Sequence, residues 1–304
     1  MESTFFDFGK HILSDTQFVV FGIPWDELTT INSPNSKIAP QTIRKISQNL
    51  ALTTEQGKDI SKLKIADIGD IELEEGNWED SINRIEKFVQ DIYKENQYAV
   101  PVMIGGDHFC TYPVFKGIRD KIRETQNLGI LLFDAHLDLY EEWKENKYSH
   151  ATVSHRIYDL DNVNNHNFQI VGCRDIDNLE LEIAKKEKIN YLPAYQLNEM
   201  GIKVYVNKVI DFFKRQKIDS LYVSIDVDVL DSSNAPATGY PIPGGLSYRE
   251  LWQILRNLTQ NFQVIGFDLV EVAPNLDHNN ITSNLAAKII IEFISFISDT
   301  LEDN

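Results

Sequence analysis

The sequence has few cysteines and few basic residues, and each shortage excludes a class of protein. Cys110 and Cys173 are the only cysteines among 304 residues, too few for a disulfide framework or a four-cysteine zinc site. Lys and Arg together number 29 against 46 Asp and Glu, so the formal net charge is −17. This negative charge argues against nucleic acid or an anionic membrane surface as a partner. It is compatible with a small cationic substrate.

The sequence also lacks a long apolar run and an export signal. No stretch approaches the roughly 20 consecutive apolar residues that a membrane-spanning helix needs. The N-terminal segment MESTFFDFGKHILSD has no basic region followed by an apolar one, so it does not resemble a signal peptide. We therefore expect a cytoplasmic protein without a membrane partner.

Eight short apolar runs, rich in β-branched residues, are spread along the whole chain. Continuous apolar character, rather than alternation, is typical of strands buried on both faces of a parallel sheet. The predicted strands are Phe18–Gly22, Lys64–Ile68, Ala99–Ile104, Leu128–Phe133, Phe168–Gly172, Ile189–Leu192, Leu221–Ile225 and Val264–Phe267.

Helical patterns lie between most of these runs. Apolar residues recur every three to four positions from Asn77 to Asn96, and Pro40 opens a helix at APQTIRKIS. Ser247 and Glu250 have the spacing of a capping box, and LAAKIIIEFISFI near the C-terminus is apolar nearly all round, as in a packed helix. No linker or repeat interrupts residues 1–304. We therefore predict a single α/β domain, a three-layer α/β/α sandwich with a central, mainly parallel eight-stranded sheet.

Three of the predicted strands end in aspartate and histidine. The segments are Gly105-Gly106-Asp107-His108, Asp134-Ala135-His136-Leu137-Asp138 and Asp226-Val227-Asp228. In parallel α/β sheets, ligands bind beyond the carboxyl ends of the strands. Side chains two residues apart in an extended segment project to the same side, so we expect Asp134, His136 and Asp138 to converge, and likewise Asp226 and Asp228.

Four aspartates in one dry cleft would repel each other, and each unpaired buried charge would cost several kcal/mol. Two divalent cations would neutralise the four charges. Two imidazoles complete an oxygen- and nitrogen-rich ligand set that suits manganese better than structural zinc. A binuclear site of this kind activates water as a nucleophile near neutral pH. The six predicted ligands are His108, Asp134, His136, Asp138, Asp226 and Asp228.

Each motif alone has a simpler explanation. The DxHxD segment could cap a strand end, GGDH could mark a turn, and DxD is common at magnesium or solvent sites. The occurrence of all three at strand ends in one chain favours a shared metal site.

The combined motifs resemble the ureohydrolases, the arginase/agmatinase family of binuclear manganese hydrolases. The resemblance covers nearly the whole chain. It is carried by GIPWDELTT, APQTIRKIS, IADIGDIEL, GGDHFCTYP, DAHLDLY, NKYSHA, SIDVDVLD, APATGYPIPGGLS and FDLVEVAPNLD.

The resemblance implies a role for each predicted ligand. One manganese would be held by His108 and Asp138 and the other by His136 and Asp228, with Asp134 and Asp226 bridging both. Asp138 would also orient the nucleophile between the metals. His150 matches the histidine that passes a proton to the leaving amine, and Glu271 matches the carboxylate that binds the guanidinium.

The chain departs from the family pattern at four positions, none of them a ligand. Phe109 replaces the usual Ser after GGDH, and Ser232 replaces the usual Pro after the DxD segment. Ala237 and Ala151 stand where Gly is common. We therefore expect the metal site to be intact and the shape of the pocket to differ.

The resemblance leaves the substrate open. Tyr140 stands where animal-type arginases have an Asn that helps bind the substrate carboxylate, which favours agmatine, an amine without one. Asp177 lies in a segment that resembles the one contacting the substrate amino group in arginases. We rank agmatinase first, then arginase, then a guanidinobutyrase or guanidine hydrolase, the last of which raises nickel in place of manganese.

A non-enzymatic alternative is an inactive metal-binding subunit, although retention of His150 and Glu271 favours turnover. A histone-deacetylase-like amidohydrolase shares the architecture but uses a mononuclear zinc pattern that this chain lacks. The family further implies a homotrimer or homohexamer and a place in polyamine biosynthesis.

Overall fold

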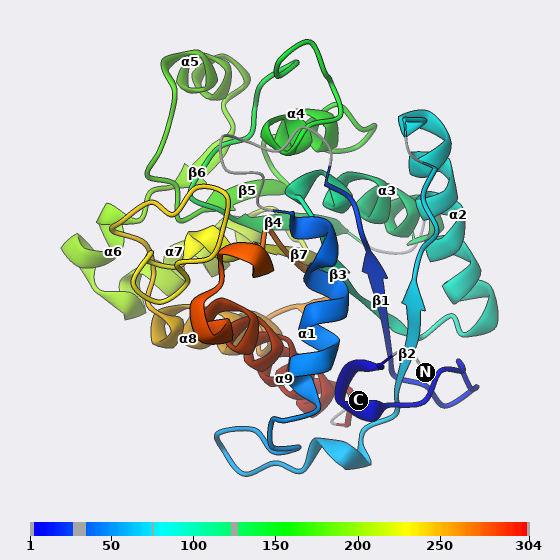
Figure 1. Cartoon of the computed structure of the whole chain (residues 1–304). Helices are drawn as coiled ribbons and strands as arrows, with labels where there is room; N and C mark the ends of the chain where they lie inside the picture. The colour runs from blue at the N-terminus through cyan, green and yellow to red at the C-terminus, as the bar shows by residue number, and fades with distance from the viewer. Residues whose placement is uncertain (1–2, 27–34, 75, 123–126, 303–304) are drawn as a thin grey trace.

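The computed structural model describes residues 3–26, 35–74, 76–122 and 127–302, so the second half of the GIPWDELTT motif lies outside the described residues. Within them, eight parallel strands form one sheet in the order β2-β1-β3-β8-β7-β4-β5-β6 (Figure 1). All eight predicted strands are confirmed. They are β1 Phe18–Ile23, β2 Ile65–Asp70, β3 Val100–Gly105, β4 Leu128–Phe133, β5 Phe168–Val171, β6 Asn190–Leu192, β7 Ser220–Asp226 and β8 Gln263–Val270.

Helices cover both faces of the sheet. The described helices are α1 Ala39–Ser47, α2 Trp78–Glu95, α3 Thr111–Ile122, α4 Val153–Tyr158, α5 Asn178–Glu187, α6 Tyr195–Met200, α7 Ile202–Arg215, α8 Tyr248–Thr259 and α9 Ile281–Glu302. Alternation along β1 shows the layers. Phe18 and Val20 belong to the apolar cluster that includes residues of α1, α7, α8 and α9, whereas Val19 and Phe21 belong to the cluster that includes residues of α2, α3, α4 and α5. The predicted three-layer α/β/α fold is confirmed.

The predicted helix ends follow their local signals. Asn77 accepts a hydrogen bond from the backbone N–H of Asp80 at the start of α2, and Pro40 lies in the first turn of α1. Both hydrogen bonds of the capping box between Ser247 and Glu250 are present at the start of α8.

The C-terminal helix corrects one expectation from the sequence. Among the described residues, the segment His278–Leu301 is by length and composition long and apolar enough to cross a membrane. However, 78% of its most apolar stretch is buried within the protein, where α9 contacts α1, α8 and β8. Burial against the sheet and between its neighbours α1 and α8 explains why this helix is apolar on nearly every side, as the sequence predicted.

The strand order brings the strands that end in the predicted site residues together at the centre of the sheet. β3 and β4 are consecutive in the chain, but β8 and β7 lie between them. The four strands that end in the predicted site residues are therefore neighbours, in the order β3-β8-β7-β4, and all point the same way. Their carboxyl ends meet at one edge of the sheet, which places the site there.

Candidate metal centre and active site

The turn after β3 requires glycine. A Cβ atom on Gly106 would lie 1.8 Å from the carbonyl oxygen of Trp25, a distance that no side chain tolerates. The backbone N–H of Asp107 donates a hydrogen bond to the same carbonyl at 2.9 Å. This close approach turns the chain sharply, and His108 then enters a short 3₁₀ turn (His108–Cys110) capped by Asp107. His108 is fully buried at the end of the sheet.

Two further residues hold the His108 ring. Its Nε2 lies 3.1 Å from Ser224 Oγ, and the Ser224 hydroxyl donates to Asp268 Oδ1 at 2.6 Å. Both partners are fully buried. A hydrogen-bonded outer ring nitrogen fixes the orientation of a metal-binding histidine, so the opposite nitrogen, Nδ1, faces the cluster of aspartates.

The segment after β4 converges by turning rather than by alternation. Residues 134–138 are not extended strand, and Asp138 adopts a left-handed backbone conformation with φ of 52°. The predicted cause of the convergence, an extended segment whose alternate side chains share one side, is therefore wrong for Asp134, His136 and Asp138. It is also wrong for Asp226 and Asp228, because Asp228 lies in the 3₁₀ turn Val227–Val229. Strain of about 1–3 kcal/mol is typical of such a residue and is found mainly at functional sites.

After β7, Asp226 caps the 3₁₀ turn Val227–Val229 by accepting a hydrogen bond from the backbone N–H of Asp228 at 2.8 Å. Asp228 in turn accepts from the backbone N–H of Ala135 at 3.0 Å. The two aspartates thus tie the ends of β7 and β4 together.

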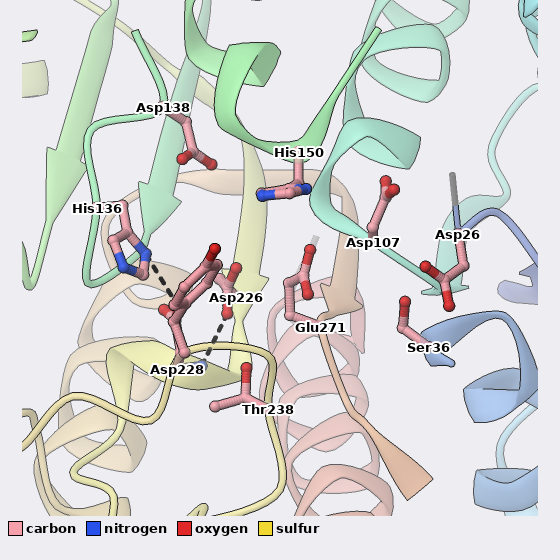
Figure 2. Close-up of a pocket in the computed structure, with 11 residues that line it drawn as sticks. Asp26, Ser36, Asp107, His136, Asp138, His150, Asp226, Asp228, Thr238 and Glu271 are labelled. Carbon is pink, nitrogen blue, oxygen red and sulfur yellow. Dashed lines mark hydrogen bonds and ion pairs between the residues drawn. The ribbon is translucent and has the colours of Figure 1, made fainter. Parts of the chain in front are cut away.

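All six predicted ligands meet in one small volume. His108 Nδ1 lies 2.9 Å from Asp134 Oδ2 and 3.3 Å from both Asp138 Oδ2 and Asp226 Oδ2. His136 Nδ1 lies 3.1 Å from Asp228 Oδ2 and 3.3 Å from Asp134 Oδ1. Figure 2 shows His136, Asp138, Asp226 and Asp228 directed toward the same side of a cavity.

These atoms form two groups that could each hold a metal ion. One contains His108, Asp134 and Asp138, and the other contains Asp134, His136 and Asp228. Asp134 belongs to both groups, the position expected of a bridging carboxylate. Asp226 lies in neither three-residue group but reaches His108.

The chemistry of these donors fits cations. His108 Nδ1 is buried, and oxygen atoms of Asp134, Asp138 and Asp226 lie 2.9–3.3 Å from it. One ring nitrogen cannot satisfy three carboxylates, so these atoms are better arranged around a shared cation. Six nitrogen and oxygen ligands without sulfur suit manganese or a similar divalent ion.

The pKa values of the ligands also indicate that the site favours a cation. Burial, and then the charge of Asp134, raise the pKa of Asp138 well above its usual value. Burial and the neighbouring Asp228 do the same to Asp226. Burial alone would lower the pKa of both histidines, but the surrounding carboxylates raise it well above the usual value. Two divalent cations would remove this conflict by neutralising four carboxylates.

Glu271 follows β8 and shares the cavity with the six ligands. Its backbone is left-handed, with φ of 64°, and its side chain is 9% exposed. Glu271 Oε1 accepts a hydrogen bond from the backbone N–H of His108 at 2.8 Å. Burial raises the pKa of Glu271 to about 8, so a cation beside it would favour the charged form.

His150 begins a 3₁₀ turn, His150–Thr152, and lines the same cavity (Figure 2). Its Nδ1 lies 3.4 Å from Ser149 Oγ, which leaves Nε2 as the nitrogen available to a ligand. Burial, and then the positive charges of His136 and His108, lower the pKa of His150 to about 4. The ring is therefore neutral near pH 7 and must receive a proton before it can pass one on.

The structure places Tyr140 and Asp177 farther out than the metal ligands. Both line an outer chamber of about 330 Å³ that opens next to the metal ligands His136 and Asp138. Tyr140 packs on Trp143 with ring centroids 4.9 Å apart, and Asp177 caps α5. Burial, and then the charges of Glu180 and Asp177, raise the pKa of Tyr140 to about 12.

The sequence reasoning did not assign several residues that line the inner cavity, among them Asp26, Ser36 and Thr238. Asp26 and Thr238 lie in the motifs GIPWD and APATG, which were recognised without assigning these residues a role. Ser36 lies outside any motif, so no sequence signal would have found it.

Taken together, an all-parallel α/β/α sheet with an Asp/His cluster and the buried carboxylate of Glu271 in one cavity defines a metal-dependent hydrolase for a small cationic substrate. The model of the arginase family matches residues 16–295. The chain is 32% identical to an agmatinase of Pyrococcus horikoshii over 93% of this chain and 92% of that protein. It is 30% identical to the N(1)-aminopropylagmatine ureohydrolase of Thermococcus kodakarensis over 84% of this chain and 83% of that protein.

The fold has similar relatives among solved structures. The agmatine ureohydrolase of Thermoplasma volcanium superposes with a TM-score of 0.86 at 28% identity, covering 100% of this chain and 97% of that one. The chain belongs to the arginase family and is a ureohydrolase-type enzyme, a hydrolase that acts on guanidino compounds.

Proposed function

We propose that this enzyme hydrolyses agmatine to putrescine and urea with two manganese ions per subunit. The observation that carries the proposal is the contact between Glu271 and the backbone of His108. This hydrogen bond places the Glu271 carboxylate, which suits a guanidinium cation, next to His108, one of the predicted metal ligands.

Glu271 would bind and orient the guanidinium. Guanidinium is a planar cation whose N–H groups pair well with carboxylate oxygens. Because the His108 N–H already donates to Oε1, the second oxygen of Glu271 is left for the substrate. The bound cation would lower the pKa of Glu271 from about 8 and keep it charged.

The six ligands would hold the metal pair, which when bound supplies an activated water and stabilises developing negative charge. His150 would act on the leaving side. A neutral imidazole accepts a proton at Nε2 and can then donate it to the departing amine nitrogen. The overall reaction consumes one water and releases urea and an amine.

The outer chamber favours an amine tail over a carboxylate tail. Asp175, Asp177 and Glu180 line it, and among the described residues no Lys or Arg does. An ammonium group is attracted to such a chamber, whereas the carboxylate of arginine would be repelled. The aromatic faces of Tyr140 and Trp143 add a surface that suits a cation.

The competing substrates remain arginine, guanidinobutyrate and guanidine, the last with nickel as the alternative metal. Urea and ammonia release should be measured for these three and for agmatine, after reconstitution with manganese or with nickel. We expect the highest kcat/KM for agmatine with manganese. A higher value for another compound would overturn the agmatine assignment, and no release from any of them would favour an inactive metal-binding subunit.

We further propose a cytoplasmic homotrimer or homohexamer that contributes to polyamine biosynthesis. The support is the family, whose resemblance implies this assembly. Light scattering on the metal-loaded protein should give three or six chains per particle, and a monomer would contradict the proposal.

A further inference from the structure

The inner cavity contains more polar groups than the reaction described above uses. Besides metal ligands, His150 and Glu271, it is lined by Asp26, Ser36, Asp107, Thr238 and Tyr240. Figure 2 shows Asp26 and Ser36 beyond Glu271, on the side of the cavity away from His136 and Asp138.

Two polar atoms of this cavity have no hydrogen-bond partner among the described residues. They are Asp26 Oδ1 and Thr238 Oγ1, and both atoms are buried. Thr238 is 2% exposed, and Ser36, whose hydroxyl pairs with the Asp26 carboxylate, is 0% exposed. Leaving a buried polar atom unpaired costs about 1–3 kcal/mol, so two in one cavity indicate a polar ligand.

Charge identifies the kind of ligand. Asp26 and Glu271 are carboxylates that line the same cavity. The backbone amides of Lys37 and Ser36 and the Ser36 hydroxyl hold Asp26 in place. A cation between the two carboxylates would relieve their mutual repulsion.

The number of donors on the proposed substrate matches this surplus of acceptors. A singly substituted guanidinium carries five N–H donors in one plane. One oxygen of Glu271 is already occupied by the His108 N–H, so Glu271 alone leaves most of these donors unpaired. Additional oxygens at the same end of the cavity are therefore needed.

We propose that Asp26, Ser36 and Thr238 form a second wall of the guanidinium pocket, with Asp26 supplying a second carboxylate that determines specificity for a cationic head group. This inference rests on the proposed function, because it assigns these atoms to the guanidinium of the same substrate. The three residues bind and select the head group and take no part in proton transfer.

The test measures binding, so it does not require turnover. Guanidinium chloride at low millimolar concentration and butylammonium chloride are titrated into metal-loaded protein by calorimetry, as probes of the head group and of the tail. Asp26→Asn should weaken guanidinium binding about tenfold, because it removes a charge-assisted hydrogen bond, and Thr238→Val about threefold. Butylammonium binding should change less than twofold in both.

The matched control is Asp175→Asn, which removes an exposed carboxylate from the outer chamber and should leave guanidinium binding unchanged. Thr238→Val should also keep the melting temperature, because its hydroxyl has no partner to lose within the described residues. It therefore serves as the test if Asp26→Asn fails to fold.

If the substrate is a guanidino compound, the KM of Asp26→Asn should rise about tenfold while kcat changes less than threefold. Unchanged guanidinium affinity in both variants would overturn the second wall, and so would an equal loss of butylammonium affinity. Absence of urea release by the wild type would instead overturn the proposed function and leave the guanidinium titration interpretable.

Discussion

His108 and Glu271 are joined by a hydrogen bond from the backbone N–H of the histidine to Oε1 of the glutamate, at 2.8 Å. The Glu271 N–H in turn donates to the carbonyl of Gly106 at 2.8 Å. The ends of β3 and β8 are thereby fixed to each other. The predicted metal-facing and substrate-facing residues consequently keep a constant separation, which is what a precise site requires.

Glu271→Gln should reduce kcat/KM at least about 100-fold, because the amide can still accept from the His108 N–H but no longer carries the charge that binds a guanidinium. Steady-state kinetics and metal analysis check this, and the metal content should be unchanged. Glu292→Gln is the matched control, since Glu292 is also buried but contacts Trp252, Lys288 and the Glu55 backbone and does not line the cavity. Equal kinetics for the two variants would contradict the assignment.

Asp134→Ala or Asp226→Ala should abolish metal binding and activity together, because each removes a predicted bridging carboxylate while the other acidic ligands still repel one another. Elemental analysis after incubation with excess manganese measures the metal content. Asp299→Ala, an exposed position paired with Lys58, should keep two ions per subunit. Full metal content in either bridging variant would refute the bridging role.

His150→Ala should lower kcat about 100-fold and retain the metal, because it removes a proton carrier and no ligand. His155→Ala is the control: this histidine lies in α4, contacts the carbonyl of Leu139 and lines neither cavity. Both variants should be assayed under saturating substrate. Unchanged turnover in His150→Ala would mean that another group carries the proton.

Asp231 fastens the loop that carries Thr238, and its contribution to stability should depend on pH. It accepts hydrogen bonds from Ser233 and Gly244, and the Ser233 hydroxyl and amide lower the pKa of Asp231 to about 2. Because the folded pKa lies below the unfolded value, this stabilisation is present above about pH 4 and is lost as the pH falls toward 2.

Asp231→Asn should therefore unfold at a temperature a few degrees lower than the wild type at pH 7, with the difference shrinking between about pH 4 and pH 3. Melting temperatures measured across this range check the prediction. A difference that stays constant down to pH 3 would show that the charge of Asp231 does not stabilise the loop.

The strands and the six ligand positions could be predicted from the sequence because their signals are local. Apolar runs such as Leu128–Phe133 identify buried strands whatever lies beside them, and the polar residues that follow must lie at strand ends. Capping by Ser247 is equally local. The predicted convergence of Asp134, His136 and Asp138 also occurs, although a left-handed turn at Asp138 produces it and not the extended chain that the spacing suggested.

By itself, then, the sequence determined the strands, the helix caps and the residues able to bind metal, since these depend on neighbours a few positions away. Only the tertiary structure decided that β8 and β7 lie between β3 and β4, which sets Glu271 beside His108. It also decided that Asp26 and Ser36, from near the N-terminus, share a cavity with Thr238. The order of the strands and the choice of loops that lie next to one another depend on how helices pack across the whole sheet. No short stretch of sequence encodes that packing.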